Sequence, residues 1–273
     1  PLGSVGEQGL SAWVIDAAPL ASYSEQGLTR VVIRDVTTEH QADQVRRDFV
    51  ANASHELRTP MAIINGYLEN LLDDDLLDDP VMSRRFLETM RKHGQRISLL
   101  VEDMLVISKM ESGDAMLLNM DSFSIKECVN DVCDRLEAMI SQQQAVVDIS
   151  VVPDDLCMMG DRFYWTQVIF NLMENALKQN PQGPLKLVVQ AEKSEDQIKI
   201  SICDNGVGIP AADLPYIFKR FYRVEKHHSQ SEIKGTGLGL SIVRRAIEAH
   251  GGKITASSIP GQQTCFVISL PVE

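Results

Sequence analysis

The chain has 273 residues and a formal net charge of −12, with 44% hydrophobic and 23% charged residues. This length accommodates about two domains, and the composition is typical of a globular protein with a buried core. A protein that reads duplex DNA normally carries a basic face or a basic domain. The acidic balance therefore argues against nucleic acid as a direct partner.

The cysteines are scattered, odd in number and without a C-x-x-C pair: Cys128, Cys133, Cys157, Cys203 and Cys265. This pattern argues against a disulfide framework or a structural zinc site and fits a reducing compartment, with a redox-sensing thiol as the functional alternative. No segment approaches the ~18 consecutive apolar residues that cross a bilayer. Residues 1–4 resemble the remnant of a cleaved tag, so we expect a soluble piece of a longer protein.

The first predicted elements are two short strands, residues 11–16 and 28–36, which are β-branched runs around a Ser/Glu/Gly break. Roughly thirty residues are too few for an independent domain. Residues 5–37 are therefore expected to be the end of a larger, truncated domain.

From about Thr38 the apolar residues recur in steps of three and four, which predicts a helix. The acidic stretch ending in Pro80 breaks it, and a second helix then runs to about Ser112. The apolar seam of this second helix includes His93, which we expect to be packed rather than functional. Two helices cannot bury stripes of this length between themselves, so a homodimer that closes an antiparallel four-helix bundle is expected.

Helical and strand-like patterns alternate after Gly113. The predicted helices are 124–143, 161–179 and 237–250, and the predicted strands are 145–152, 156–159, 184–191, 196–203, 253–258 and 264–270. Helices that alternate with antiparallel strands predict a two-layer α/β sandwich, so the chain as a whole is of the α+β class. Residues 219–236 show no periodicity and are predicted to be a mobile loop.

A histidine with distinctive neighbours lies on the first helix, in the block His55-Glu56-Leu57-Arg58-Thr59-Pro60. His55 lies about 200° around the helix from the apolar Leu57, so it is expected to face solvent, where a near-neutral imidazole is a usable nucleophile. Glu56 is placed to hold a proton or to orient the ring. Thr59 lies one turn further on the same face, where its hydroxyl can position a water, and it rules out an H-E-x-x-H zinc motif.

Two asparagines one helical turn apart, Asn171 and Asn175, are expected to point the same way from their helix. Neutral amide oxygens at this spacing suit Mg²⁺, which keeps most of its waters and bridges substrate phosphates. Lys178 lies close to the same face, where it can neutralise phosphate charge. Asp204 follows a strand and is placed to accept a hydrogen bond from an adenine amino group.

The remaining candidates for nucleotide binding are a loop arginine and the glycines of two turns: Arg223, Gly206, Gly208, Gly235, Gly237 and Gly239. The first two glycines let the backbone approach the base closely. The last three lead into a helix whose N-terminal amides can bind a triphosphate, and the arginine is a candidate contact for the γ-phosphate.

A single G-x-G-x-G run is a weak signal, and asparagine pairs are common on helices. The Rossmann fingerprint does not fit, because its loop follows the first strand of a βαβ unit. Residues 251–254 lack the spacing of a P-loop. The order of the motifs supports ATP binding: an asparagine helix, an Asp-Gly turn, an aromatic loop and a glycine loop.

Residues 38–271 resemble the sensor histidine kinases of bacterial two-component systems, and look most like the phosphate-responsive or cell-wall-responsive members. Five blocks carry the resemblance in the family's order: a phosphoacceptor box at 49–60, an N box at 171–178, a G1 box at 204–210, an F box at 217–224 and a G2 box at 235–240.

The resemblance implies a signalling helix and a dimerisation and phosphotransfer hairpin over residues 38–113, and a catalytic ATP-binding domain of the Bergerat type over residues 114–273. Residues 5–37 become the last strands of a truncated PAS-like sensor domain, because Asp35-Val36-Thr37 resembles the motif that closes one. The resemblance also implies a response regulator as partner. The parent protein is then anchored in the cell membrane with these domains in the cytoplasm.

The resemblance also implies a role for three residues of the phosphoacceptor box. His55 accepts the phosphoryl group from ATP and Mg²⁺, Glu56 takes its proton, and Thr59 holds the water that attacks phosphoaspartate on the regulator.

In the catalytic domain, Asn175 becomes the Mg²⁺ ligand and Asp204 the adenine contact. Lys178 and Arg223 become phosphate contacts, and residues 219–236 become the ATP lid.

Three functions compete at this point. The first is a bifunctional kinase and phosphatase. The second is an ATPase like those of gyrase, MutL and Hsp90, which place a glutamate where this chain has Asn171; Glu174 lies roughly 100° from Asn175 on the helix. The third is a non-catalytic scaffold, which requires a broken motif, and none is broken.

Overall fold

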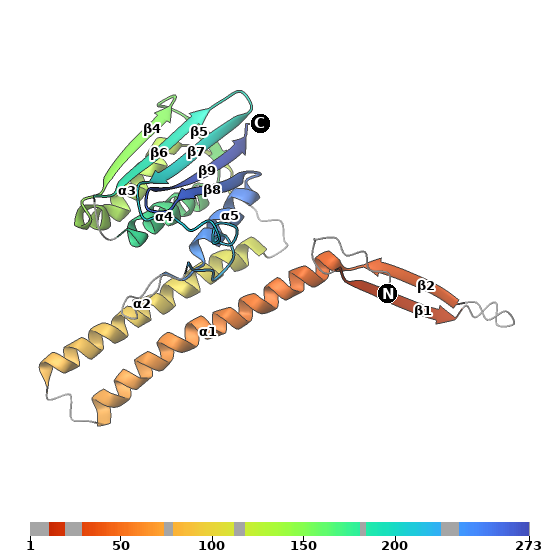
Figure 1. Ribbon diagram of the computed structural model, residues 1–273, viewed down its shortest axis with the longest axis horizontal. Helices are drawn as coiled ribbons and strands as arrows, with labels where there is room; N and C mark the ends of the chain where they lie inside the picture. Colours follow the sequence, from red (N-terminus) through yellow and green to blue (C-terminus); the bar gives the residue numbers. More distant parts are fainter. Residues whose placement is uncertain are drawn as a thin grey trace. The chain divides into compact units, whose positions relative to one another are not determined.

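The computed structural model describes residues 11–19, 29–73, 79–111, 118–180, 184–224 and 235–272. The chain divides into two compact units, Pro1–Arg58 and Thr59–Glu273, at a boundary inside the first helix. Figure 1 names the elements. None of the helices in these described ranges is long and apolar enough to cross a membrane.

The first unit contains the predicted strand pair. β1 (Trp13–Pro19) and β2 (Thr29–Asp35) run antiparallel, with Ile15 opposite Ile33. Both isoleucines are exposed, so the apolar side chains of this pair are not buried by the described part of the unit.

Asp35 fixes the start of α1 (Thr37–Asp73). Its carboxylate accepts hydrogen bonds from the hydroxyl and the backbone N–H of Thr37 at 2.6 and 2.9 Å, and these bonds lower the pKa of Asp35. The Thr37 hydroxyl also accepts a bond from the N–H of Ala12 at 2.9 Å. A carboxylate in this position interacts favourably with the helix dipole, and the three bonds join the strand pair to the helix.

In the second unit, the remainder of α1 is followed by α2 (Pro80–Glu111), as the sequence predicts. The start of α2 is capped by Asp79, whose carboxylate accepts bonds from the N–H groups of Val81 and Met82 at 2.9 and 3.2 Å. Pro80 occupies the first helical position, where its missing N–H costs nothing.

The two helices contact each other through the rings of Tyr67 and Phe86, whose centroids lie 4.8 Å apart. His93 is half-buried on α2, as expected for a packed residue. Burial is the larger cause that lowers its pKa, followed by the charge of Arg96.

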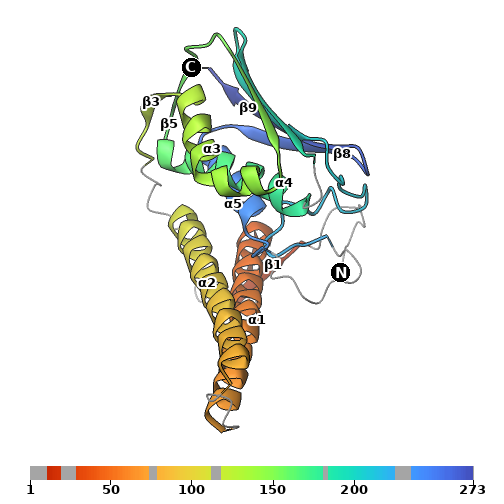
Figure 2. The same cartoon turned by 90° about the vertical axis from the view of Figure 1, so that its left-hand side faces the viewer.

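The rest of the second unit is the predicted two-layer sandwich. Its five-stranded sheet has the order β4-β6-β7-β9-β8, with these bounds: β4 Val146–Val152, β6 Lys186–Lys193, β7 Gln197–Asp204, β8 Lys253–Ile259 and β9 Gln263–Pro271. One face of the sheet is covered by three helices (Figure 2): α3 Ile125–Gln142, α4 Arg162–Gln179 and α5 Gly239–Ala249. The α+β class and every predicted helix and strand of this region are confirmed.

Two features of the strand pairing in this region differ from the sequence-based expectation. A strand that was not predicted, β3 (Asp121–Ser124), pairs with β5 (Cys157–Gly160) in a separate ribbon. It is short and mostly polar, and only Phe123 is buried. β4 pairs in parallel with β6 rather than antiparallel, because β5 and α4 intervene and provide the crossover that a parallel pair needs.

The core lies between the sheet and the helices. Strands β6, β7 and β9 alternate buried with more exposed residues, as expected for strands with one covered face. Their fully buried residues include Leu187, Val189, Ile200 and Ile268, and Ile169, Leu172 and Met173 of α4 are buried as well.

The opposite face of the sheet carries a disulfide that the scattered cysteines did not predict. Cys203 and Cys265 are bonded, with their Cα atoms 4.1 Å apart. They are 62 residues apart in sequence, and only the register of β7 against β9 brings them opposite each other. The expectation of unpaired cysteines was wrong for this pair, because spacing in sequence does not reveal register.

Candidate functional site

The predicted phosphoacceptor block lies on α1. His55 is exposed, as its angular position on the helix predicts, and Thr59 is exposed as well. Glu56 is half-buried, and the buried Pro60 follows without ending the helix. His55 and Glu56 belong to the first compact unit, whereas Thr59 begins the second.

Helix α4 carries the asparagine pair and is anchored at its start by Asp161. The Asp161 side chain accepts bonds from the N–H groups of Phe163 and Asn119, both at 3.0 Å. Its own N–H donates to Nε2 of His250 at the end of α5, at 2.9 Å. The bonds tie the start of α4 to the segment before β3 and to the end of α5, which fixes the helix that carries the predicted asparagine pair.

The far end of α4 presents its polar side chains beside the start of α5. The Asn171 amide donates to the carbonyl of Gly239 at 3.5 Å. Lys178 pairs with Glu174 at 2.8 Å, and both side chains are partly exposed. Asn175 is half-buried on the same helix. The structure therefore brings the predicted metal-site amides, a lysine and the predicted phosphate loop together.

Asp204 ends β7 with a buried carboxylate. Burial is the largest influence on its pKa and raises it. Two hydrogen bonds act in the opposite direction: Oδ1 accepts from the N–H of Gly206 at 2.9 Å and from Nδ2 of Asn180 at 3.3 Å. A carboxylate held in this way is a fixed acceptor for a ligand amino group.

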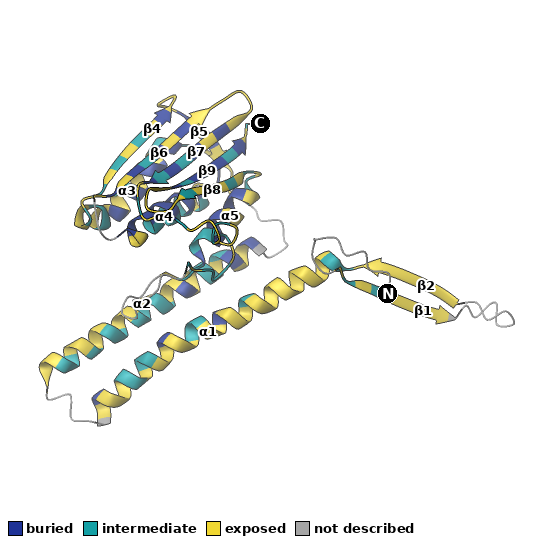
Figure 3. Ribbon diagram, in the orientation of Figure 1, coloured by how far each residue is buried: buried dark blue, intermediate teal, exposed yellow. Residues whose placement is uncertain are grey.

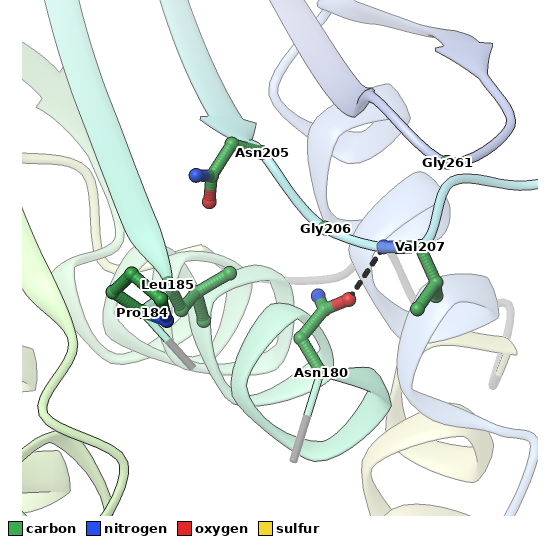
Figure 4. Close-up of a pocket in the computed structure, with 7 residues that line it drawn as sticks. All are labelled: Asn180, Pro184, Leu185, Asn205, Gly206, Val207 and Gly261. Carbon is green, nitrogen blue, oxygen red and sulfur yellow. Dashed lines mark hydrogen bonds between the residues drawn. The ribbon is translucent and has the colours of Figure 1, made fainter. Parts of the chain in front are cut away.

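Asn180 is a site residue that the sequence analysis missed. It follows α4 and is buried. Its Oδ1 accepts from the N–H of Val207 at 2.7 Å (Figure 4). Its Nδ2 also donates to the carbonyl of Ala176 at 2.7 Å. An asparagine directly after a helix and before a proline is a C-terminal capping signal that the sequence did offer.

Gly206 must be a glycine because of Asn180. A Cβ at Gly206 would lie 2.0 Å from the Asn180 Oδ1, which is far inside van der Waals contact. The asparagine therefore joins the end of α4, the carboxylate of Asp204 and the turn that follows β7 into one interlocked group.

A pocket of about 230 Å³ lies at this junction (Figure 4), lined by Asn180, Pro184, Leu185, Asn205, Gly206, Val207 and Gly261. Gly206 is the member of this lining that the sequence analysis predicted. The pocket is thus next to the predicted base contact and does not include the asparagine pair.

The other predicted glycines divide into two kinds. Gly208 and Gly237 have φ angles of 70° and 75°, which favour glycine. A Cβ there would also lie 2.6 Å from the carbonyl oxygen of Ile259 and 2.9 Å from the Cα of Phe221, respectively.

Gly235 and Gly239 have no such backbone requirement. A Cβ at Gly235 would meet nothing within 4 Å, and one at Gly239 would lie 3.3 Å from the Asn171 Oδ1. Arg223 is exposed, and residues 225–234 of the expected lid lie outside the described residues.

Helix α2 also contacts the glycine loop within the second unit. The Thr236 hydroxyl donates to Oδ2 of Asp103 at 2.7 Å and accepts from the N–H of Leu238 at 3.2 Å. Burial raises the pKa of Asp103, and this is the largest influence on it. Asp103 lies on a helix 133 residues before Thr236 in sequence, so no local pattern indicated this contact.

Comparison with known proteins identifies both regions. Residues 45–113 match the model of the His Kinase A (phospho-acceptor) domain. Residues 160–273 match the family described as histidine kinase-, DNA gyrase B-, and HSP90-like ATPase. The chain belongs to the sensor histidine kinases.

Among the similar relatives of this histidine kinase is the sensor histidine kinase WalK of Bacillus subtilis, 39% identical over 242 residues that cover 88% of the chain and 39% of the relative. The sensor protein kinase WalK of Staphylococcus aureus is 35% identical over 244 residues, 89% of the chain and 57% of the relative. The chain thus spans about two fifths to three fifths of these relatives' length.

Solved histidine kinases share the fold. Acinetobacter baumannii AdeS superimposes with a TM-score of 0.62 and 29% identity, over 80% of this chain and 97% of that one. ThkA, solved in complex with the response regulator protein TrrA, gives a TM-score of 0.66 over 94% of this chain and 74% of that one, at 24% identity.

Proposed function

We propose that this histidine kinase phosphorylates itself on His55 from ATP and Mg²⁺ and passes the phosphoryl group to an aspartate of a response regulator. The observation that supports this most directly is the exposed His55 of a phosphoacceptor domain in a chain that also carries the complete asparagine and glycine motifs of an ATP site.

The proposed reaction is an in-line displacement. A ring nitrogen of His55 attacks the γ-phosphorus, the bond to the bridging oxygen breaks, and ADP leaves. The ring proton passes to Glu56, the next residue on the helix. Catalysis of this kind depends mainly on positioning and on offsetting the charge of the phosphoryl oxygens.

The nucleotide would be held by residues of the sandwich. Asp204 accepts from the adenine amino group, and the turns at residues 206–208 and 235–239 let the backbone approach the ligand. Lys178 and Arg223 supply positive charge to the phosphates.

Mg²⁺ would be held by Asn175, with Asn171 beside it, and would offset the charge of the phosphates. Within the described residues there is no group of three or more His, Cys, Asp or Glu side chains that could hold a metal ion. A site of amide oxygens, phosphates and water fits Mg²⁺, which rarely uses an all-protein cage.

The hairpin would provide the dimer interface. Large apolar side chains along α1 and α2 are exposed in the single chain (Figure 3): Val45, Val50, Met61, Leu68, Leu72, Val81, Leu87, Leu99, Val101 and Leu105. A second copy that closes a four-helix bundle would bury such stripes. Thr59 is exposed and would hold the water that attacks the phosphoaspartate of the regulator in the dephosphorylation step.

The proposal extends to the parent protein. Residues 5–37 would be the last strands of a PAS-like sensor domain, residues 38–113 the signalling and phosphotransfer helices, and residues 114–273 the catalytic domain. The exposed apolar residues of β1 and β2 fit strands that the rest of such a domain would cover. These domains would lie in the cytoplasm, beneath a membrane anchor elsewhere in the parent.

The test is incubation with γ-labelled ATP and Mg²⁺, followed by exposure of the product to acid and to alkali. Label that is lost in acid and kept in alkali is expected, and His55→Gln is expected to remove it. His40→Gln is the matched control, because His40 is also exposed on α1, and it should keep the label.

The competing functions give different results. Rapid release of phosphate without labelled protein would indicate an ATPase, and ATP binding without label would indicate a scaffold. Label that persists in His55→Gln would contradict the assignment of the phosphoacceptor.

A further inference from the structure

The disulfide lies on the uncovered face of the sheet. In the register, Cys203 and Cys265 form one row with Val188 on β6 and Ser257 on β8. Both sulfur-bearing residues are half-exposed, whereas the residues next to them along each strand are buried against the helices. A reagent in solution therefore has access to the disulfide without unfolding the core.

Each cysteine is directly followed or preceded by a residue that supports the nucleotide site. Asp204 follows Cys203, Thr264 precedes Cys265, and the two are opposite each other in the register. Because successive side chains of a strand point to opposite faces, both lie on the helix-covered side, and both are buried.

These two buried residues hold the two ends of the turn that follows β7. Asp204 binds the N–H of Gly206 at 2.9 Å. Thr264 lies 3.1 Å, hydroxyl to hydroxyl, from Ser258, whose hydroxyl accepts the N–H of Ile209 at 2.8 Å. The turn at residues 204–209 is thus attached at both ends one residue away from the disulfide.

We propose that Cys203 and Cys265 form a reversible thiol–disulfide modification site that controls the affinity of this kinase for ATP. The inference rests on the proposed function, because it concerns the same nucleotide site. The chemical partners are a hydroperoxide as oxidant and a dithiol as reductant.

In oxidation, one thiolate attacks the hydroperoxide to give a sulfenic acid and release hydroxide or an alkoxide. The second thiolate then displaces hydroxide from that sulfur and forms the disulfide. The two thiol protons end on the two oxygen leaving groups, so two thiols lose two electrons and two protons in all. In reduction, a dithiol attacks one sulfur, and its second thiol resolves the mixed disulfide, which restores both cysteines.

Reduction breaks the bond between the two sulfur atoms, which must then move apart to van der Waals distance. This separation shifts β7 relative to β9 beside the nucleotide site. The shifted pair, Cys203 and Cys265, is next to the pair Asp204 and Thr264 in the register. The oxidised form holds the Asp204 carboxylate in the arrangement described above, so the oxidised form is expected to bind nucleotide more tightly.

The other cysteines do not share this arrangement. Cys128 is buried, and burial raises the pKa of its thiol. Cys133 is half-buried, and its thiol pKa is raised for the same reason. Cys157 is exposed on the separate β3–β5 ribbon, and it serves as a control. In a reducing compartment, a disulfide on an accessible face is typically transient and regulatory.

The test measures the dissociation constant for ADP by calorimetry in a Cys157→Ser background, which prevents linkage between molecules through that thiol. One sample is oxidised with hydrogen peroxide and the other reduced with dithiothreitol, and mass spectrometry of alkylated peptides confirms the state of each cysteine. We expect at least fivefold weaker ADP binding in the reduced sample, reversed on reoxidation.

The variant Cys203→Ser should bind ADP with the same affinity in both conditions. Equal ADP affinities of the oxidised and reduced Cys157→Ser protein would overturn the inference, and so would tighter ADP binding by its reduced form. If the Cys157→Ser protein binds no ADP in either state, the proposed function is contradicted instead. Failure of the redox inference and failure of the proposed function are therefore distinguishable.

Discussion

The helical hairpin and the sandwich bury their apolar residues in different ways. Many large apolar side chains of α1 and α2 remain exposed, and Leu99 is 52% exposed. In the sandwich, Leu172 and Met173 of α4 and the facing strand residues are almost fully buried. The core of the sandwich is buried by its own chain, whereas the hairpin leaves large apolar side chains exposed, which the proposed dimer would bury.

This difference separates two tasks. A self-contained core can hold a ligand site rigidly, because its side chains are fixed by close packing. A surface that is completed only by association ties its stability to concentration and to the state of its partner. The predicted nucleotide motifs lie on the first kind of region, and His55, the proposed phosphoacceptor, lies on the second kind.

The largest expected effect tests this comparison directly. Leu172→Ala in the sandwich removes a buried side chain and should lower the free energy of unfolding by about 2–5 kcal/mol. The loss should be the same at low and high protein concentration, as measured by urea unfolding.

The matched change in the hairpin is Leu99→Ala. Truncation of an exposed side chain changes the free energy of unfolding of a single chain by no more than about 0.5 kcal/mol. A larger loss of unfolding free energy must therefore come from association and must vary with protein concentration. A loss in Leu99→Ala that is large and independent of concentration would contradict the proposed dimer interface.

An intermediate effect is expected from Gly206→Ala. The added Cβ would lie 2.0 Å from the Asn180 Oδ1, so the asparagine must move and release both the turn and Asp204. Misplacement of a positioning group by about 1 Å can lower a reaction rate on the order of 100-fold. We expect a loss of similar size in ADP affinity, measured by calorimetry.

The control for this glycine is Gly94→Ala in α2, where a Cβ meets nothing within 4 Å. Removal of a glycine from a helix interior should stabilise the protein by roughly 0.5–1 kcal/mol and leave ADP binding unchanged. Unaltered ADP affinity in Gly206→Ala would show that the turn does not form part of the nucleotide site.

The smallest expected effect is a change in thermal stability, which comes from Asp204→Asn and depends on pH. Burial raises the pKa of Asp204 above its usual 3.8, so its favourable contribution to stability is present below pH 3.8 and is lost as pH rises through the folded-state pKa. The variant should therefore be more stable than the parent at pH 7, with no such gain below pH 3.8, as measured by thermal unfolding.

The same variant should bind ADP more weakly. The asparagine oxygen can keep the bond from Gly206, which leaves its NH₂ group to face the adenine amino group. An unsatisfied buried donor costs about 1–3 kcal/mol, roughly 5- to 150-fold in affinity. A thermal shift of equal size at both pH values would show that the carboxylate charge is not the cause.

The sequence was sufficient for features that depend on local pattern. The exposure of His55 followed from its angle to Leu57, and the break before α2 followed from the acidic run and Pro80. The strand pair of residues 11–36 and the helices of the sandwich followed from apolar periodicity. Each of these depends on residues that are close together in the chain.

Features that depend on distant residues were missed. The bond between Cys203 and Cys265 and the parallel pairing of β4 with β6 require the strand order and register. The contact of Thr236 with Asp103 joins residues 133 apart in sequence. The role of Asn180 lies between these cases, since its capping position was visible but its bond to Val207 was not.

The two-sided character of helix α4 affects how mutations in it can be interpreted. One side of it carries Asn171, Asn175 and Lys178, and the other side contributes Trp165 and Leu172 to the core. A substitution that shifts the helix within the core must also shift the polar residues on its other side. Selection on signalling output would therefore recover changes at Trp165 and Leu172 together with changes at the asparagines, and a loss-of-signal phenotype alone would not tell a packing defect from a chemical one.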